Sequence, residues 1–424
     1  MSESTRRDVD LPPPLMTSEP GSFARYTILE RKPKIVQQVI ESNNYPLDIV
    51  QALEALHEEI GSRPMQGLRE QTPDAAFWNR GLAKYEGKTW LEVPWYFAET
   101  VFYRRLLEAV RYFQPGPWEG HDPFGKRKRE QEALAVAQLA ESWGQLAGVE
   151  PGMAFEILLH SCLWGNRADL SYHAVAAQAR GGLVAGEERH HLLIDHTDAA
   201  RELLTSGLRR VTFVNDNAGM ELLSDLALTD FLLVQGWAQE VVFHLKDRPF
   251  FVSDAMPEDV RSLVASLQAV PDAAMRELVS RLHEHLAVQR LILKDDAPSE
   301  SSGQRFWTSP LMFREMPPRL RTELPSSDLV ILKGDANYRR LLDDRHWPHT
   351  TRLEDVTGYF PAPFLTLRTL KAEIMVGLQP GQAETLAAED PEWLINGKRG
   401  IIQLVAGPEA PLRPDETRDV RRET

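Results

Sequence analysis

Beyond about residue 180, short apolar segments alternate with segments of helical periodicity, and this alternation limits the folds open to the chain. Strand-like runs occur at residues 192–194, 210–214, 241–245, 329–332 and 400–405, with 250–252 as a further short extended piece. Helical patterns lie between them, at residues 198–206, 220–235, 257–267 and 272–285. Apolar strands that alternate with helices are typical of a mostly parallel sheet covered on both faces. The sequence therefore predicts an α/β fold with a Rossmann-like, mostly parallel sheet flanked by helices.

The preceding part of the chain has helical periodicity throughout. Ile49, Leu53, Leu56 and Ile60 recur at the spacing of one helix face, and an aromatic-rich helix is expected over residues 95–113. The run FGKRKREQE (124–132) contains four consecutive basic residues. We interpret this run as a solvated loop or helix start, with a partner-binding patch as the alternative.

These patterns divide the 424 residues into four parts. Residues 1–21 are polar and proline-rich and are predicted to be a disordered tail, as is the charged end of the chain, residues 408–424. Between the tails we expect an α-helical domain over residues 22–180 and an α/β domain over residues 181–407.

Composition narrows the choice of partners and compartment. The formal net charge is −14, which argues against bulk binding to nucleic acid or to anionic membranes, because phosphates must be met by cations. Cys162 is the single cysteine, so no disulfide can form within the chain. No signal peptide and no long apolar run is present in the sequence. We expect a cytoplasmic protein, a monomer or weak homo-oligomer, that acts on a small molecule.

Three polar residues stand where one of the strand-like runs ends. In FVNDNAGMEL (213–222), the apolar run stops on Asn215, Asp216 and Asn217, and Gly219 precedes a helical pattern. Ligands of doubly wound sheets bind at the carboxyl ends of the strands, which is where these residues lie. Capping of the next helix is the alternative role for one such side chain, but three consecutive polar residues exceed what a cap requires.

A second candidate, Asp254, follows the apolar segment VVFHLKDRPFFVS, about one strand–helix–strand step beyond Asp216. Because neighbouring parallel strands end at one edge of a sheet, we expect Asp216, Asn217 and Asp254 to converge there. Two carboxylates and one amide oxygen are hard ligands that suit Mg²⁺ or Mn²⁺. The spacing therefore predicts a divalent metal site with positions left for water and a substrate phosphate.

Two further segments supply groups that suit a phosphate. LVILKGDANYRRLL (329–342) places a turn glycine, Gly334, beside cations and amide donors, although a capped helix with solvent-facing arginines is the alternative. FLTLRTLKAE (364–373) offers Arg368 and Lys371, of which Lys371 taken alone would be an ordinary surface lysine.

Together, DNAG (216–219), FVSD (251–254), KGDANYR (333–339) and LRTLK (367–371) resemble the motifs of a known family. This family is the metal-dependent damage-control phosphatases of the domain-of-unknown-function-89 superfamily. RTLK resembles the RTxK motif of its third subfamily, which also carries the name acidic-residue methyltransferase. Residues 22–36, 92–109 and 163–171 also resemble that subfamily's N-terminal half.

The resemblance implies a helical N-terminal part, a Rossmann-like core and a role for each motif residue. Asp216, Asn217 and Asp254 would hold a divalent metal ion (Mn²⁺, Mg²⁺, Co²⁺ or Ni²⁺) and would act in catalysis together with Lys371. The phosphate of the substrate would be contacted by Asp335, Ala336, Asn337, Tyr338, Arg339 and Lys371. Asn166 and Asp169 either border the cleft or serve as a turn and a helix cap.

The predicted activity is therefore hydrolysis of small phosphomonoesters, with sugar phosphates such as fructose 1-phosphate as the substrates that the resemblance implies. Lys371 and Arg339 would stabilise the charge on the transferred phosphoryl group, and Asn337 with the amides near Gly334 would orient it. The metal ion would activate the attacking water, which Asp254 or Asp335 would orient.

Two other functions remain as alternatives. One is S-adenosylmethionine-dependent O-methylation of protein carboxyl (glutamate) side chains, an activity also attached to the third subfamily. A Rossmann methyltransferase usually has a glycine-rich turn after its first strand, and neither NDNAGM (215–220) nor HTDAAR (196–201) contains GxG. The other is a helical scaffold with a vestigial α/β domain, which would not bind a metal ion.

Overall fold

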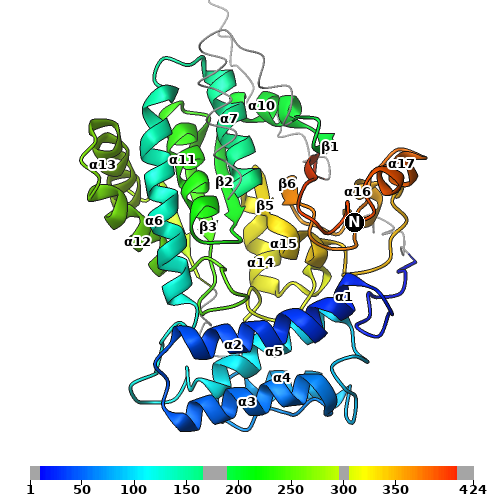
Figure 1. Cartoon of the computed structure of the whole chain (residues 1–424). Coiled ribbons are helices and arrows are strands. Elements are labelled where there is room, and N and C mark those ends of the chain that lie inside the picture. The colour runs from blue at the N-terminus through cyan, green and yellow to red at the C-terminus, as the bar shows by residue number, and fades with distance from the viewer. Residues whose placement is uncertain (1–9, 166–188, 296–304, 408–424) are drawn as a thin grey trace, which may run out of the picture.

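The structure, a computed structural model, describes residues 10–165, 189–295 and 305–407. Its centre is a seven-stranded sheet with the strand order β1-β7-β6-β5-β2-β3-β4 (Figure 1). The strands are β1 (Leu192–Asp195), β2 (Leu208–Val214), β3 (Ala238–His244), β4 (Leu291–Lys294), β5 (Leu329–Lys333), β6 (Phe364–Thr369) and β7 (Gly400–Val405). All neighbouring strands run parallel except β6 and β7, which run antiparallel. The predicted mostly parallel α/β fold is confirmed.

Apolar residues of the strands feed two separate cores, one on each face of the sheet. Along β5, Leu329 and Ile331 enter one core, whereas Val330 and Leu332 enter the other. This division follows from strand geometry, because successive side chains point to opposite faces. A strand buried on both faces must be apolar at nearly every position, which is the pattern LVIL shows.

Helices cover both faces of the sheet. The first face packs against α6 (Gly125–Ser142), α7 (Pro151–Trp164), α10 (Thr197–Thr205), α11 (Met220–Val234), α12 (Pro257–Gln268) and α13 (Ala273–Ala287). The second packs against α14 (Pro318–Glu323), α15 (Gly334–Leu341), α16 (Leu353–Thr357) and α17 (Gln382–Glu389). Among the described residues, no helix has the length and apolar character needed to cross a lipid bilayer.

The remaining N-terminal helices gather at one end of the molecule (Figure 1). They are α1 (Phe23–Tyr26), the π-helical turn η1 (Thr27–Arg31), α2 (Lys32–Ser42), α3 (Leu47–Ser62), α4 (Ala75–Ala83) and α5 (Trp95–Ala109). The apolar faces of η1 and of α2 to α5 form a third core, which includes the predicted stripe of α3 and also Phe250 from the loop after β3, whereas Ala24 of α1 packs in the core on the second face of the sheet. That loop therefore connects the helical end to the sheet. The predicted domain boundary near residue 180 lies outside the described residues.

Some local predictions from the sequence need correction. Residues 10–21 are not a free tail, because Leu15 is buried and its amide donates to the carbonyl of Asp344 at 2.8 Å. The piece at 250–252 is a turn rather than a strand, since the chain reverses there and Phe251 has a φ of 50°. Strands β4 and β6 are additional to the strand-like runs found in the sequence.

Candidate active site

A cavity of about 210 Å³ lies at the carboxyl ends of β2, β5 and β6. It brings together residues from the segments that follow β2, β3, β5 and β6, including seven of the nine predicted site residues: Asp216, Asn217, Asp254, Asp335, Ala336, Arg339 and Lys371. Helix α5 of the N-terminal end closes the cavity with Trp95, Glu99 and Tyr103. This edge is where α/β sheets bind ligands, so the fold itself favours a site here.

The loop after β2 and the loop after β3 are joined by backbone hydrogen bonds. Ala255 donates its amide to the carbonyl of Asp216 at 2.8 Å, and Ala218 donates to the carbonyl of Ser253 at 2.6 Å. Asn217 and Asp254 thereby form an antiparallel bridge, although β2 and β3 themselves run parallel. The reversal of the chain at Phe251 allows this pairing. The pairing holds the side chains of Asp216 and Asp254 close enough to repel each other.

Negative charge is concentrated at this bridge. Burial, followed by repulsion from Glu221 and Asp254, raises the pKa of Asp216 well above its usual range. Burial also raises the pKa of Asp254 to about 6, although Lys246 and Lys128 oppose the shift. Oδ2 of Asp254 is buried without a hydrogen-bond donor, and the nearest cation, Nζ of Lys246, lies 3.6 Å away. A site of this kind favours a cation, because a cation would stabilise both carboxylates in their ionised form.

The donor atoms at the bridge fit a hard divalent ion. Carboxylate and amide oxygens are the ligands that Mg²⁺ and Mn²⁺ prefer. Within the described ranges, no three His, Cys, Asp or Glu side chains are grouped as metal ligands. The fit therefore depends on Asn217 as the third donor beside Asp216 and Asp254.

Asn217 is oriented by three side chains. Its amide nitrogen donates to Oδ2 of Asp216 at 2.8 Å and to Oε2 of Glu221 at 3.0 Å. Its amide oxygen accepts a hydrogen bond from the hydroxyl of Ser253 at 2.5 Å. Sequence reasoning missed Glu221, which lies four residues after Asn217 in the first turn of α11.

Lys333 lies behind the cavity rather than in it. Its side chain is fully buried, and its ammonium group contacts Asp225 at 2.7 Å and Glu221 at 3.1 Å. Lys333, one of the cations of the segment LVILKGDANYRRLL, therefore does not line the cavity. Lys333 instead offsets the charge of Glu221 and holds the start of α11 against β5.

The helix that follows β5 sends only part of the KGDANYR motif toward the cavity. Asp335, Ala336 and Arg339 line it, whereas Asn337 and Tyr338 are buried in the opposite direction. Asn337 donates to the carbonyl of Lys333 at 2.8 Å, and the Tyr338 hydroxyl accepts from the amide of Val376 at 3.3 Å. Asn337 and Tyr338, which the sequence predicted to contact the substrate, therefore do not line the cavity in this structure, because helical periodicity turns them into the core.

Arg339 reaches the cavity but already has anionic partners. Its guanidinium contacts Glu99 at 2.5 Å and Asp344 at 2.7 Å, and it stacks on Trp95 at 3.5 Å from the ring centre. These contacts hold Arg339 rigidly and offset its charge, so its predicted role in neutralising a phosphoryl group is weakened. Its position instead ties α15 to α5.

Lys371 is the predicted cation that remains exposed on the wall. In the part of the chain that the structure describes, no carboxylate lies within 4.0 Å of its ammonium group. The preceding Arg368 is fully buried and donates to Asp335 at 2.8 Å and to the carbonyls of Ala372 and Ile374. Arg368 thus fixes the loop that presents Lys371, whose own amide donates to Asp335 at 3.2 Å. Asn166 and Asp169 lie outside the described residues.

Fold and cavity together define an α/β protein with an acidic, metal-compatible site at the strand ends. The family described as the damage-control phosphatase ARMT1-like domain matches residues 27–386, and the chain belongs to this family. The chain is similar to proteins named damage-control phosphatase ARMT1 along nearly their whole length. The protein from Danio rerio is 30% identical over 93% of this chain and 97% of its own. The protein from Homo sapiens is 32% identical over 93% of this chain and 98% of its own.

A solved structure is also similar. It is a DUF89 family protein from Pyrococcus horikoshii, 13% identical, with a TM-score of 0.47, and the match covers 90% of this chain and 97% of that chain.

Proposed function

We propose that this protein is a metal-dependent phosphatase that hydrolyses small phosphomonoesters, with sugar phosphates such as fructose 1-phosphate as the expected substrates. One observation carries the proposal: Asp216, Asn217 and Asp254 converge with Lys371 on one cavity at the carboxyl edge of the sheet. Membership of the damage-control phosphatase family supports the same activity.

The proposed mechanism gives each cavity residue a task. Asp216, Asn217 and Asp254 would hold the cation, which would supply charge neutralisation at the phosphate and a lower pKa for an attacking water. Lys371 places a positive charge where the oxygens of the transferred group develop negative charge. The carboxylate of Asp335 accepts hydrogen bonds from the backbone amide of Lys371 and from the side chain of Arg368. Asp335 therefore holds Lys371 in place.

Phosphate release from a panel of sugar phosphates tests the proposal. The protein is first treated with a chelator and then assayed with Mn²⁺, Mg²⁺, Co²⁺ or Ni²⁺. We expect no release after chelation and recovery with at least one ion. Hydrolysis that is indifferent to chelation would contradict the metal assignment. Tight binding of S-adenosylmethionine in a calorimeter, with no hydrolysis of any ester, would favour the methylation alternative.

Gly334 gives a more local prediction. It has a φ of +82°, and a Cβ at this position would lie 1.9 Å from Oδ2 of Asp216. In Gly334→Ala the carboxylate must move, so we expect kcat/KM to fall by about 10²-fold, the loss typical of a displacement of about 1 Å at a reacting centre. Phosphate release at a saturating metal concentration measures the effect.

Gly381 supplies the matched control. Its φ is +83°, but a Cβ there would meet no atom within 4 Å. Gly381→Ala therefore carries the same backbone strain without the collision, and we expect its kcat/KM to match that of the parent within about twofold. Equal activity losses in the two alanine variants would show that strain, and not Asp216, explains the effect.

A further inference from the structure

The candidate active site continues outward into a second, larger space of about 590 Å³. Arg31, Asn217 and Lys371 line both spaces, so the two spaces adjoin each other. The inner part holds the acidic bridge. The outer part, which we call the outer cavity, is large enough for the remainder of a sugar-sized substrate.

Two helix faces give the outer cavity a basic wall. Arg31, Lys34 and Gln38 recur at helical spacing along η1 and α2. Arg127 and Gln131 face them from one side of α6, and Gln131 lies against Gly219 of the turn after Asn217. The wall therefore combines three cations with amide groups close to the acidic bridge.

These cations are poorly compensated within the protein. Over the described ranges, no carboxylate lies within 4.0 Å of the guanidinium of Arg31 or Arg127. Lys34 contacts Glu30 at 3.6 Å, but both side chains are more than half exposed, and such pairs are weak. Among the described residues that line the outer wall, Glu221 is the one acidic side chain, and it is already paired with buried Lys333. In a chain with a net charge of −14, such a cluster is unexpected unless it meets an anion.

The run FGKRKREQE was interpreted from the sequence as a solvated stretch or a partner patch. In the structure its four basic residues have different surroundings. Lys126 and Arg129 are exposed and do not line the cavity, whereas Lys128 is buried between Asp122 and Asp259. Of the four basic residues, Arg127 is the one on the outer cavity. Arg129 therefore provides a control from the same helix.

We propose that the outer cavity is a specificity subsite for a second anionic group of the substrate, a phosphate or a carboxylate at the far end of the sugar from the ester that is cleaved. The proposal rests on the proposed function, because the inner cavity must take the scissile phosphate. Arg31 and Arg127 bind the second anion, and Lys34 adds to the local positive charge. A substrate that is neutral at its far end would leave this wall facing only water.

Three substrates of similar size test the subsite: fructose 1-phosphate, fructose 1,6-bisphosphate and 6-phosphogluconate. We expect kcat/KM to be about tenfold or more higher for at least one of the two doubly anionic substrates, as for a charge-assisted contact, and the preference to shrink in high salt. Comparison of the bisphosphate with the sugar acid separates a phosphate from a carboxylate as the second anion.

Variants locate the effect. Arg127→Ala should raise KM for the preferred substrate about tenfold while kcat/KM for fructose 1-phosphate changes less than about threefold, because Arg127 lines the outer cavity and not the inner one. Arg129→Ala should change neither value. Equal kcat/KM for all three substrates, or equal losses on all three in the variants, would overturn the subsite while leaving the phosphatase assignment intact. No hydrolysis of any ester with any divalent ion would instead remove the proposed function itself.

Discussion

Asp254→Asn is expected to lower phosphate release on the order of 10³-fold, because one of the two carboxylates that would hold the metal ion is lost and a metal ion contributes several kcal/mol of transition-state stabilisation. Asparagine keeps the shape of the side chain, so the loop pairing between Asn217 and Asp254 remains possible. The assay is kcat/KM at several metal concentrations, and excess metal should restore little activity.

The melting temperature with and without a metal ion provides a second test of Asp254→Asn, which does not depend on enzymatic turnover. Mn²⁺ should raise the melting temperature of the parent protein and not that of the variant, because a ligand stabilises only the state that binds it. Burial already raises the pKa of Asp254 to about 6, so removal of its charge should not destabilise the metal-free protein. Asp272→Asn is the control, since Asp272 caps α13 away from the cavity and asparagine caps equally well. Parental activity in Asp254→Asn would contradict the proposed metal site.

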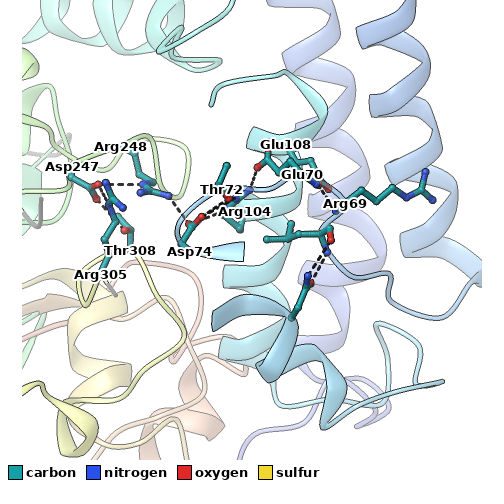
Figure 2. A network of polar contacts seen from close by, with 12 residues as sticks. Arg69, Glu70, Thr72, Asp74, Arg104, Glu108, Asp247, Arg248, Arg305 and Thr308 are labelled. Carbon is teal, nitrogen blue, oxygen red and sulfur yellow. Dashed lines mark hydrogen bonds and ion pairs between the residues drawn. The ribbon is translucent and has the colours of Figure 1, made fainter. Parts of the chain in front are cut away.

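The second large effect concerns a buried chain of charges that joins the helical end to the loop carrying Asp254. Figure 2 shows Asp74 between Arg104 of α5 and Arg248 of the loop after β3. Asp74 accepts from Arg104 at 3.0 Å and from Arg248 at 2.8 Å, and all three side chains are buried. The network of charges extends from Arg248 to Asp247, which in turn contacts Arg305. The position of the Asp254 loop thus depends on a contact between distant parts of the sequence.

Asp74→Ala should lower the free energy of unfolding by about 3 kcal/mol, because it removes the carboxylate that two buried guanidinium groups share and leaves Arg104 only Glu70 and Arg248 only Asp247 as anionic partners among the described residues. Urea unfolding measures the loss. Asp198→Ala removes an exposed ion pair with Arg201 and should cost about 1 kcal/mol or less. Similar losses in the two variants would show that the network contributes no more than a surface pair.

The same network predicts a dependence on pH. Burial opposes ionisation of Asp74, but the hydrogen bonds and charge of Arg104, followed by the charge of Arg248, outweigh it and hold the pKa of Asp74 below its ordinary value. A lowered pKa contributes stability above the unfolded-state pKa, and this contribution is lost as the pH falls toward the folded-state pKa. The difference in unfolding free energy between the parent and Asp74→Ala should therefore be constant near neutral pH and shrink once the pH falls below about 4. Urea unfolding at a series of pH values checks this.

Much of the architecture could be predicted from the sequence, because it depends on neighbouring residues. The apolar run 329–332 and the stripe of Ile49, Leu53, Leu56 and Ile60 carry the periods of a buried strand and of a helix face. Polar residues directly after such runs must lie at a strand end, which is why Asp216 and Asp335 could be assigned to one edge of the sheet. Strand β4 was missed, because only three residues separate it from the end of α13 and no glycine or proline among them marks the change of period.

The roles of individual charges were decided only by the tertiary structure. Lys333, Arg339 and Lys371 look alike as cations in the sequence, yet Lys333 is enclosed by Asp225 and Glu221, Arg339 by Glu99 and Asp344, and Lys371 alone of the three remains exposed at the cavity. Likewise, Asp254 reaches Asn217 only because the loop after β3 turns back at Phe251. The physical reason is that periodicity is a property of adjacent residues, whereas the effect of a charge depends on its burial and on partners that folding brings from remote parts of the chain.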